Sequence, residues 1–306
     1  MSAQKNWNVG TEPTAAGALL EEYTGIHCGN CPDGHRVAAT LHMLNPGLIN
    51  VVAVHGGPYA EPYPDEPNFA TPEGEALVSA AGANSFPSAS INRTPYNRAF
   101  FIGRSNWSFA CREAVSHIAP INLYASSSYD KASRKLAVAV EGYTLEAPEG
   151  TTRLAVAIVQ NNVMGPQSGG QVGSEYMHQH MLRKFLTDIN GDPIEVAAGQ
   201  YFEKEFEYDV PERIGDVDVD PLNLEVVAFV AKDDRTVLNS ITCRPACEGM
   251  EAPVDVIVEK YRLEISKNYA FPYVELRMTN RGTSPVTSAT FECEFNGEVA
   301  TLGWEG

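Results

Sequence analysis

The feature that most constrains the fold is a change in hydrophobic periodicity near residue 120. Before it, strand-like apolar runs at 18–23 and 48–57 alternate with helical patterns, the last of which spans 105–118. Strands that alternate with helices indicate an α/β fold with a central sheet. After it, residues 121–247 follow period two in segments separated by turn residues, which is typical of an all-β, Ig-like sandwich.

Residues 248–306 offer three or four further strands, too few for an independent core, and predict a partial or docked β segment. A chain of 306 residues is long enough for two or three domains. The sequence therefore predicts an α+β multidomain protein with an α/β domain at 1–120, a β-sandwich at 121–247 and a short β segment at 248–306.

Charge and hydropathy exclude some classes of partner. The chain carries 39 acidic and 22 basic residues, a net charge of −17, so it lacks the basic surface that nucleic-acid binding requires. No apolar run approaches the roughly 20 residues of a spanning helix. The first residues lack the basic and apolar regions of a signal peptide. Either the protein is cytosolic, or it is exported and its processed N-terminus has been replaced.

Residues 28–31 read Cys-Gly-Asn-Cys, where a polar turn becomes an amphipathic helix that Asn45-Pro46-Gly47 ends. Unpaired backbone N–H groups and the positive end of the helix dipole stabilise a thiolate at Cys28. A thiolate attacks disulfides or binds metal, so redox chemistry and metal binding are the two functional interpretations. A structural disulfide is the alternative.

The stretch "LLEEYTGIHCGNCPDGH" followed by "FPSASINR", and later "YMHQHMLRKF", resembles the outer-membrane-protein-28 family of Gram-negative bacteria over residues 15–243. The resemblance implies a thioredoxin-like fold for residues 1–120. It also implies an exported protein in the periplasm or associated with the outer membrane or cell surface.

The wider thioredoxin superfamily implies the roles of the candidate site residues. Cys28 attacks, Cys31 resolves, and Pro87 faces the pair in cis. Glu22 stands six positions before Cys28, where a buried acid would accept the proton of the resolving thiol if it points inward. The alternative is that Glu22 faces solvent. His27 replaces the bulky tryptophan usual before the motif, so the surface that meets a partner protein differs.

The sequence predicts no metal site and no cofactor. Zinc would need about four ligands, and the histidines nearest the cysteines, His27, His35 and His55, lack a finger-like spacing. His178 and His180 would share a face if their segment is a strand, but we expect both to be structural or surface residues.

Four cysteines lie outside the motif. Cys111 is on the apolar face of a helix and is expected to be a buried thiol. Cys243 and Cys247 are close enough to bridge across a turn, which export would favour. Cys293 is expected in a strand, and its partner cannot be inferred from the sequence.

Two functions of different class follow. The first is an envelope thiol–disulfide oxidoreductase that acts on protein thiols or disulfides. Because Gly29 and Asn30 add no positive charge, we expect its reduction potential to be nearer the roughly −270 mV of thioredoxin than the roughly −120 mV of strong oxidants. The second is an envelope binding or scaffold protein with an unidentified protein partner, in which the motif is a stable disulfide. The β-rich majority of the chain favours the second, and the set of Glu22, Cys28, Cys31 and Pro87 favours the first.

Overall fold

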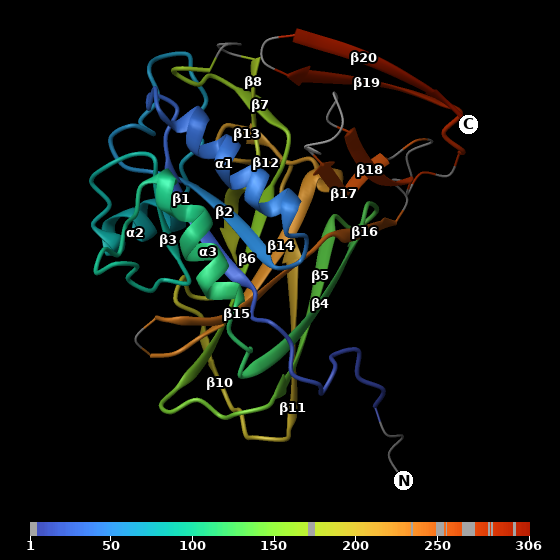
Figure 1. Ribbon diagram of the computed structural model, residues 1–306. Helices are drawn as coiled ribbons and strands as arrows, with labels where there is room; N and C mark the ends of the chain where they lie inside the picture. Colours follow the sequence, from blue (N-terminus) through green and yellow to red (C-terminus); the bar gives the residue numbers. More distant parts are fainter. Residues whose placement is uncertain are drawn as a thin grey trace. The chain divides into compact units, whose positions relative to one another are not determined.

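The computed structural model describes residues 5–170, 175–233, 235–248, 254, 256–264, 273–280, 282, 284–295 and 298–306 (Figure 1). The chain forms two compact units, Met1–Glu248 and Gly249–Gly306. The break falls one residue after the boundary that the sequence suggested at 247. No helix in the part of the chain that the structure describes is long and apolar enough to cross a membrane.

The centre of the first unit is an eight-stranded sheet in the order β15-β14-β6-β9-β2-β1-β3, with β10 paired to β6. Its strands are β1 (Ala18–Thr24), β2 (Ile49–His55), β3 (Ser88–Ile91), β6 (Thr152–Gln160), β9 (Met181–Phe185), β10 (Asp192–Ile194), β14 (Leu224–Ala231) and β15 (Val237–Cys243). β1 and β2 are parallel, and β2 meets β9 in parallel at Ala53 and Met181.

This sheet corrects the predicted domain boundary at residue 120. Strands from both sides of that boundary share it, so residues 1–120 and 121–247 are not separate bodies. The two parts join at the edge of β2, where Ala53 pairs with Met181 of β9 and the Ala53 amide donates to the His180 carbonyl at 2.8 Å. Every residue of β1 and of β2 is buried, as expected for strands covered on both faces.

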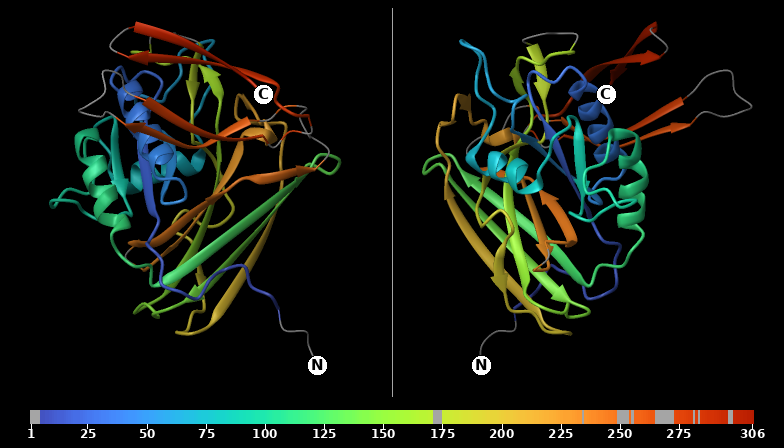
Figure 2. Two further views of the ribbon diagram at one scale, coloured as in Figure 1. Left: turned by 45° about the vertical axis from the view of Figure 1, so that its right-hand side comes forward. Right: turned by 90° about the vertical axis from the view of Figure 1, so that its left-hand side faces the viewer.

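Helices cover both faces of the sheet at the β1–β3 end, as the right-hand view of Figure 2 shows. They are α1 (Cys31–Leu44), α2 (Pro72–Ala81) and α3 (Trp107–Val115), with a 3-10 turn η1 (Arg104–Asn106) before α3. Thr71 caps α2 by accepting a hydrogen bond from the Gly74 amide, and Gly82 ends it with φ 66°. Ala18 and Leu20 of β1 pack with α1 and α3, whereas Leu19 and Tyr23 pack with α2.

A second sheet has the order β11-β5-β4-β16. Its strands are β4 (Ile121–Asp130), β5 (Lys135–Thr144), β11 (Tyr201–Asp209) and β16 (Pro245–Glu248). It packs against β15 of the large sheet, where the Asn239 side chain accepts a hydrogen bond from the Gly17 amide and donates one to the Ile121 carbonyl. The first unit is therefore a mixed α/β structure in which strands predominate, as the pattern after residue 121 predicts.

Short elements complete the first unit. The hairpins are β7 (Val163–Gly165) with β8 (Tyr176–His178) and β12 (Arg213–Ile214) with β13 (Val217–Asp218), and η3 (Pro221–Asn223) is a 3-10 turn. The second unit contains two described hairpins, β17 (Val256–Glu264) with β18 (Tyr273–Asn280) and β19 (Ser288–Phe295) with β20 (Glu298–Glu305).

Candidate functional site

The two motif cysteines lie at the start of α1, as the sequence predicts. Cys28 and Cys31 form a disulfide with their Cα atoms 5.4 Å apart. Cys31 is the first residue of α1, and its amide donates to the Cys28 carbonyl at 3.1 Å. The turn that follows β1 therefore delivers both sulfurs to the helix N-terminus.

The disulfide is sealed, which the sequence did not indicate. The exposed fraction of Cys28 is 3% and that of Cys31 is 0%. Residues 166–170, the capping segment, lie over the turn. The Ser168 amide donates to the Ile26 carbonyl at 2.7 Å, and Gln167 Nε2 donates to the Cys28 carbonyl at 3.1 Å.

The capping segment reaches the turn through a close backbone contact. Gly169 has φ 75°, and a Cβ added there would lie 2.1 Å from the Gly29 carbonyl oxygen. A side chain at this position would thus clash with backbone and would also be conformationally strained. Because the segment and the motif are more than 130 residues apart in the chain, their contact leaves no local pattern in the sequence.

Pro87 and Glu22 meet at the first turn of α1. The Phe86–Pro87 peptide bond is cis, as expected, and Pro87 is buried. A Cβ added to Gly34 would lie 2.6 Å from Glu22 Oε1 and 2.8 Å from Pro87 Cβ. Gly34 stands three residues after Cys31, so both side chains pack within one helical turn of Cys31.

Glu22 points inward and its carboxyl lacks a full set of partners. Its exposed fraction is 1%, and Oε1 has no hydrogen-bond partner. Burial raises the pKa of Glu22 well above its ordinary value. The nearest base is His35, whose Nε2 lies 3.9 Å from Oε1. The neighbouring Glu21 is equally buried on the opposite face, where Arg93 Nε and Nη2 bind its two oxygens at 3.0 and 2.7 Å.

Three imidazoles gather beside this carboxyl. The ring centroids of His55 and His178 are 5.2 Å apart, and His35 lies 5.9 Å from His178 and 6.5 Å from His55. Burial lowers the pKa of His35 to about 3 and that of His178 to about 4, so both are neutral at pH 7. Both ring nitrogens of His55 are buried without a hydrogen-bond partner.

Contacts of His35 connect this cluster to the strands around it. Its Nε2 lies 2.7 Å from Thr24 Oγ1, and its Nδ1 lies 2.8 Å from the hydroxyl of Tyr176. Of the three histidines near the motif in sequence, His35 and His55 join the cluster. His27 does not, because it stacks on Tyr63 with centroids 3.9 Å apart and places Nε2 2.9 Å from Glu66 Oε2.

His178 and His180 do not share a face. His178 ends β8 and joins the cluster beside Glu22, whereas His180 lies in the turn before β9 with φ 53°. The side chain of His180 instead faces His42 at the C-terminal end of α1 and Glu225 of β14. One ligand atom from each of these three residues lies within 4.8 Å of the other two. No sequence spacing predicted this group, since its members come from distant segments.

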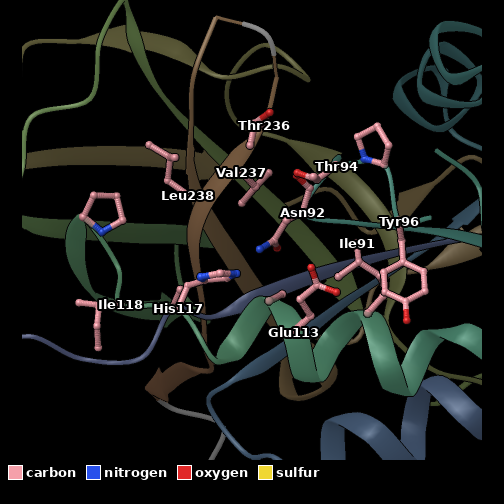
Figure 3. A pocket seen from close by; sticks show the side chains of 15 residues that line it. Ile91, Asn92, Thr94, Tyr96, Glu113, His117, Ile118, Thr236, Val237 and Leu238 are labelled. Atoms are coloured by element: carbon pink, nitrogen blue, oxygen red, sulfur yellow. The ribbon is translucent and has the colours of Figure 1, made fainter. Parts of the chain in front are cut away.

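Several hollows lie at the surface of the part of the first unit that the structure describes. One, of about 440 Å³, is lined by His27, Tyr59 and Tyr63 and by other residues of the proline-rich loop 57–71. A second, of about 270 Å³, lies between α3 and β15 and is lined in part by Asn92, Glu113, His117 and Val237 (Figure 3). None of Cys28, Cys31, Glu22 and Pro87 lines this second pocket.

The remaining cysteines differ in part from expectation. Cys111 is a buried thiol, as predicted, and burial raises its pKa to about 12, so it is unreactive. Cys243 is a free thiol with Sγ 3.4 Å from Ser127 Oγ, so it does not form the bridge to Cys247 that the spacing allowed. Cys243 is the last residue of β15 and pairs with Val226 of β14. Cys293 lies within β19.

Fold and site together define a strand-rich, mixed α/β protein with a CxxC disulfide enclosed at a helix N-terminus. A model of the family described as outer membrane protein Omp28 matches residues 74–244, more than half of the chain. The chain therefore belongs to the Omp28 family. The match includes Pro87 and the capping segment but not Cys28, Cys31 or Glu22.

Two solved structures are similar to the chain. HBP35 of Porphyromonas gingivalis is 19% identical in sequence with a TM-score of 0.60, and the match covers 95% of this chain and 98% of HBP35. A protein from Agrobacterium tumefaciens is 11% identical with a TM-score of 0.48, and the match covers 75% of this chain and 95% of that chain. At these identities the first likeness shows a shared fold and nothing further. No curated protein matches the sequence.

Proposed function

We propose that the protein is a thiol–disulfide oxidoreductase of the bacterial envelope, acting through Cys28 and Cys31 in a thioredoxin-like N-terminal region. The observation that carries the proposal is the buried carboxyl of Glu22, which lies within one turn of Cys31 with Oε1 unpartnered. The envelope location rests on the family to which the chain belongs.

A purely structural disulfide has no need of such a carboxyl. Burying a polar group without a hydrogen bond costs roughly 1–3 kcal/mol on the scale of protein mutations. The cost is understandable if the carboxyl exchanges a proton with a thiol, because its raised pKa brings it closer to the pKa of cysteine. Of the two buried acids of β1, only Glu22 has this character, since Arg93 neutralises Glu21.

The chemistry balances without a cofactor. The thiolate of reduced Cys28 attacks a partner disulfide, forms a mixed disulfide and releases one partner thiolate. Cys31 then loses its proton to Glu22 and attacks the Cys28 sulfur. The second partner thiolate leaves, two electrons have passed to the partner, and the Cys28–Cys31 disulfide seen here has formed. Run backwards, the same steps oxidise a partner dithiol, with Glu22 returning the proton.

The partner in this proposal is a protein thiol or disulfide of the envelope. Such a partner cannot reach Cys28 while the capping segment is bound, since Cys28 is 3% exposed. Displacement of residues 166–170 therefore precedes the first attack. The cost of that displacement is a few hydrogen bonds, from Gln167 and Ser168.

The same burial favours one alternative, a binding or scaffold protein in which the disulfide is structural. A disulfide that stabilises the fold is best kept from solvent and thiols, and the capping segment does this. The two functions differ in reduction potential. Stable structural disulfides lie below roughly −300 mV, and thioredoxin lies near roughly −270 mV.

The test is a disulfide-exchange assay on the purified chain with a model protein disulfide. We expect Cys28→Ser to abolish exchange and Cys31→Ser to accumulate a mixed disulfide, because the resolving thiol is missing. Glu22→Gln should slow the resolving step and leave the first attack unchanged. Cys243→Ser is the matched control, since Cys243 is a free thiol outside the site.

The scaffold function predicts a different pattern. Cys28→Ser and Cys31→Ser would then lower the free energy of unfolding by up to about 2–5 kcal/mol. Wild-type protein that neither reduces nor oxidises the model substrate, with a potential below roughly −300 mV, would replace the enzyme with the scaffold.

A further inference from the structure

A second constellation lies at the opposite end of α1 from the disulfide. It consists of His42 in the last turn of α1, His180 before β9 and Glu225 in β14, and we call it the His–His–Glu group. Cys31 and His42 are 11 residues apart, which is about 16 Å along a helix. The group is therefore separate from the redox site.

We propose that the His–His–Glu group is a Zn²⁺ site with three protein ligands and one open position. The ligands are His42 Nε2, His180 Nδ1 and Glu225 Oε2. Two imidazoles and a carboxylate are a donor set typical of zinc, and a site with three protein ligands leaves the fourth position for water or an exogenous group.

Glu225 offers its free oxygen to the centre of the group. The exposed fraction of Glu225 is 2%, and Oε2 is buried without a hydrogen-bond partner, 3.6 Å from His180 Nδ1. The other oxygen, Oε1, accepts a hydrogen bond from Arg244 Nε at 2.7 Å. Because the guanidinium occupies one side of the carboxylate, the group's orientation is fixed and only Oε2 remains for a cation.

The two histidines are oriented by contacts outside the group. His42 Nδ1 lies 2.7 Å from the Ile49 carbonyl, so it carries the proton, and the lone pair is left on Nε2. The His180 amide donates to Asn161 Oδ1 at 2.8 Å, and its carbonyl accepts from the Ala53 amide at 2.8 Å. These bonds hold His180 at its positive φ, with the side chain toward Glu225.

The helix dipole favours a cation at this place. The C-terminal end of α1, where His42 lies, carries the negative end of that dipole.

An ion-pair network is the competing explanation. The pair of Arg244 and Glu225 would form one, but it leaves Glu225 Oε2 without a hydrogen bond and gives His42 no role. A zinc ion would satisfy all three atoms. It would also tie the end of α1 to the strand β14 and to the turn before β9.

The proposal is tested by titrating Zn²⁺ into the full, chelator-treated chain with its Cys28–Cys31 disulfide intact, by calorimetry. We expect one equivalent bound by the wild type. His42→Ala and Glu225→Gln should each weaken binding by 10-fold or more, because loss of even an outer partner of a metal ligand costs roughly 10–100-fold. The matched controls are His117→Ala, at an exposed histidine two residues after the end of α3, and Cys243→Ser, and both should bind as the wild type does.

His42→Ala is the decisive variant, because it removes a half-buried side chain and leaves the Glu225–Arg244 pair intact. Circular dichroism verifies its fold, and Zn²⁺ should raise the melting temperature of the wild type but not of this variant. X-ray absorption at the zinc edge should show nitrogen and oxygen at about 2.0–2.2 Å and no sulfur near 2.3 Å. Absence of binding, equal binding by His42→Ala, loss of binding in Cys243→Ser, or a zinc–sulfur distance would each overturn the proposal.

Discussion

Glu21 and Glu22 are adjacent in β1, carry the same side chain and are equally buried, yet their surroundings differ. Glu21 is bound by Arg93 through two hydrogen bonds and accepts a third from Ser90. Glu22, on the other face, has an unpartnered oxygen and a pKa well above the ordinary value because of burial. Equal burial therefore does not imply equal surroundings, because only Glu21 is paired with a cation.

The difference follows from what covers each face of the sheet. On the Glu21 side, the turn after β3 brings Arg93 into a buried position, 5.0 Å from the ring of Phe229. On the Glu22 side lie Gly34 of α1, Pro87 and His35, none of which supplies a cation at pH 7, since burial lowers the pKa of His35 to about 3. A carboxyl placed there remains able to take up or release a proton.

The largest expected effect is on stability, from Glu21. Glu21→Ala leaves the guanidinium of Arg93 buried and uncompensated, so the free energy of unfolding in urea should fall by about 3–5 kcal/mol. At pH 4.5, where the raised pKa of Glu22 keeps its carboxyl protonated, Glu22→Gln substitutes an amide of the same shape and should change the free energy of unfolding by less than about 1 kcal/mol. Replacing both members of the pair, as in Glu21→Leu with Arg93→Met, should recover most of the loss. Equal losses in the two single variants would remove the contrast.

A smaller effect is expected where α1 touches Glu22. An alanine at position 34 would place Cβ 2.6 Å from Glu22 Oε1 and 2.8 Å from Pro87 Cβ. Such overpacking costs roughly 1–3 kcal/mol, against a gain of up to about 1 kcal/mol in helix propensity. Gly34→Ala should therefore lower the unfolding free energy, whereas Gly103→Ala, with no atom within 4 Å of the added Cβ, should not. An increase in stability for Gly34→Ala would show that Glu22 and Pro87 are not tightly packed.

Local patterns predicted α1 but left the orientation of Glu22 open. The apolar spacing of Val37, Ala38 and Leu41, with Asn45 after the helix, marked α1 correctly. The thioredoxin resemblance selected Glu22, six positions before Cys28, and the structure shows that its side chain is buried. The Ig-like character of the strands after residue 121 stays a prediction.

What the sequence could not indicate depends on contacts between distant segments. β9 joins β2 to β6 in one sheet, Gln167 closes over Cys28, and His178 joins His35 and His55. None of these contacts alters the periodicity of the segments that make it, because each segment would show the same pattern with any apolar neighbour. Arg93 likewise gives no sign in the sequence that it pairs with Glu21.

The pH dependence of stability should also separate the two acids. A group whose folded pKa is raised holds its proton longer in the native state, so its contribution is full below the ordinary value of 4.5 and is lost as pH rises toward the folded pKa. Between pH 4.5 and the folded pKa, the unfolding free energy of the wild type should thus fall by up to about 1.4 kcal/mol per pH unit relative to that of Glu22→Gln. The measurement is the difference between the two unfolding free energies at several pH values above 4.5.

Taking this difference removes an opposing effect of the histidines. The pKa of His35 is lowered to about 3 and that of His178 to about 4, so the unfolded chain binds protons below pH 6.5 that the native state does not. Their contribution is lost as pH falls, in both proteins alike. A difference that does not vary with pH would mean that the pKa of Glu22 is not raised.

The smallest expected effect concerns access to the Glu22 side. Gln167 Nε2 donates to the carbonyls of Gly25 and Cys28, and loss of one such neutral hydrogen bond costs about 0.5–1.5 kcal/mol. When opening is fast relative to reduction, the rate follows the population of the open form, so Gln167→Ala should be reduced by a phosphine about 2- to 10-fold faster than the wild type.

Asn190→Ala is the control on the opposite face. Asn190 accepts a hydrogen bond at 3.4 Å from Arg93, the residue that also binds Glu21. Its loss should leave the rate of disulfide reduction unchanged, although it weakens the surroundings of Glu21. If both variants accelerate reduction equally, the disulfide opens through general loosening of the sheet and not through residues 166–170. If neither variant accelerates reduction, the disulfide is reduced without displacement of residues 166–170. The capping segment would then not control access to Cys28, and access would not differ between the Glu22 face and the Glu21 face.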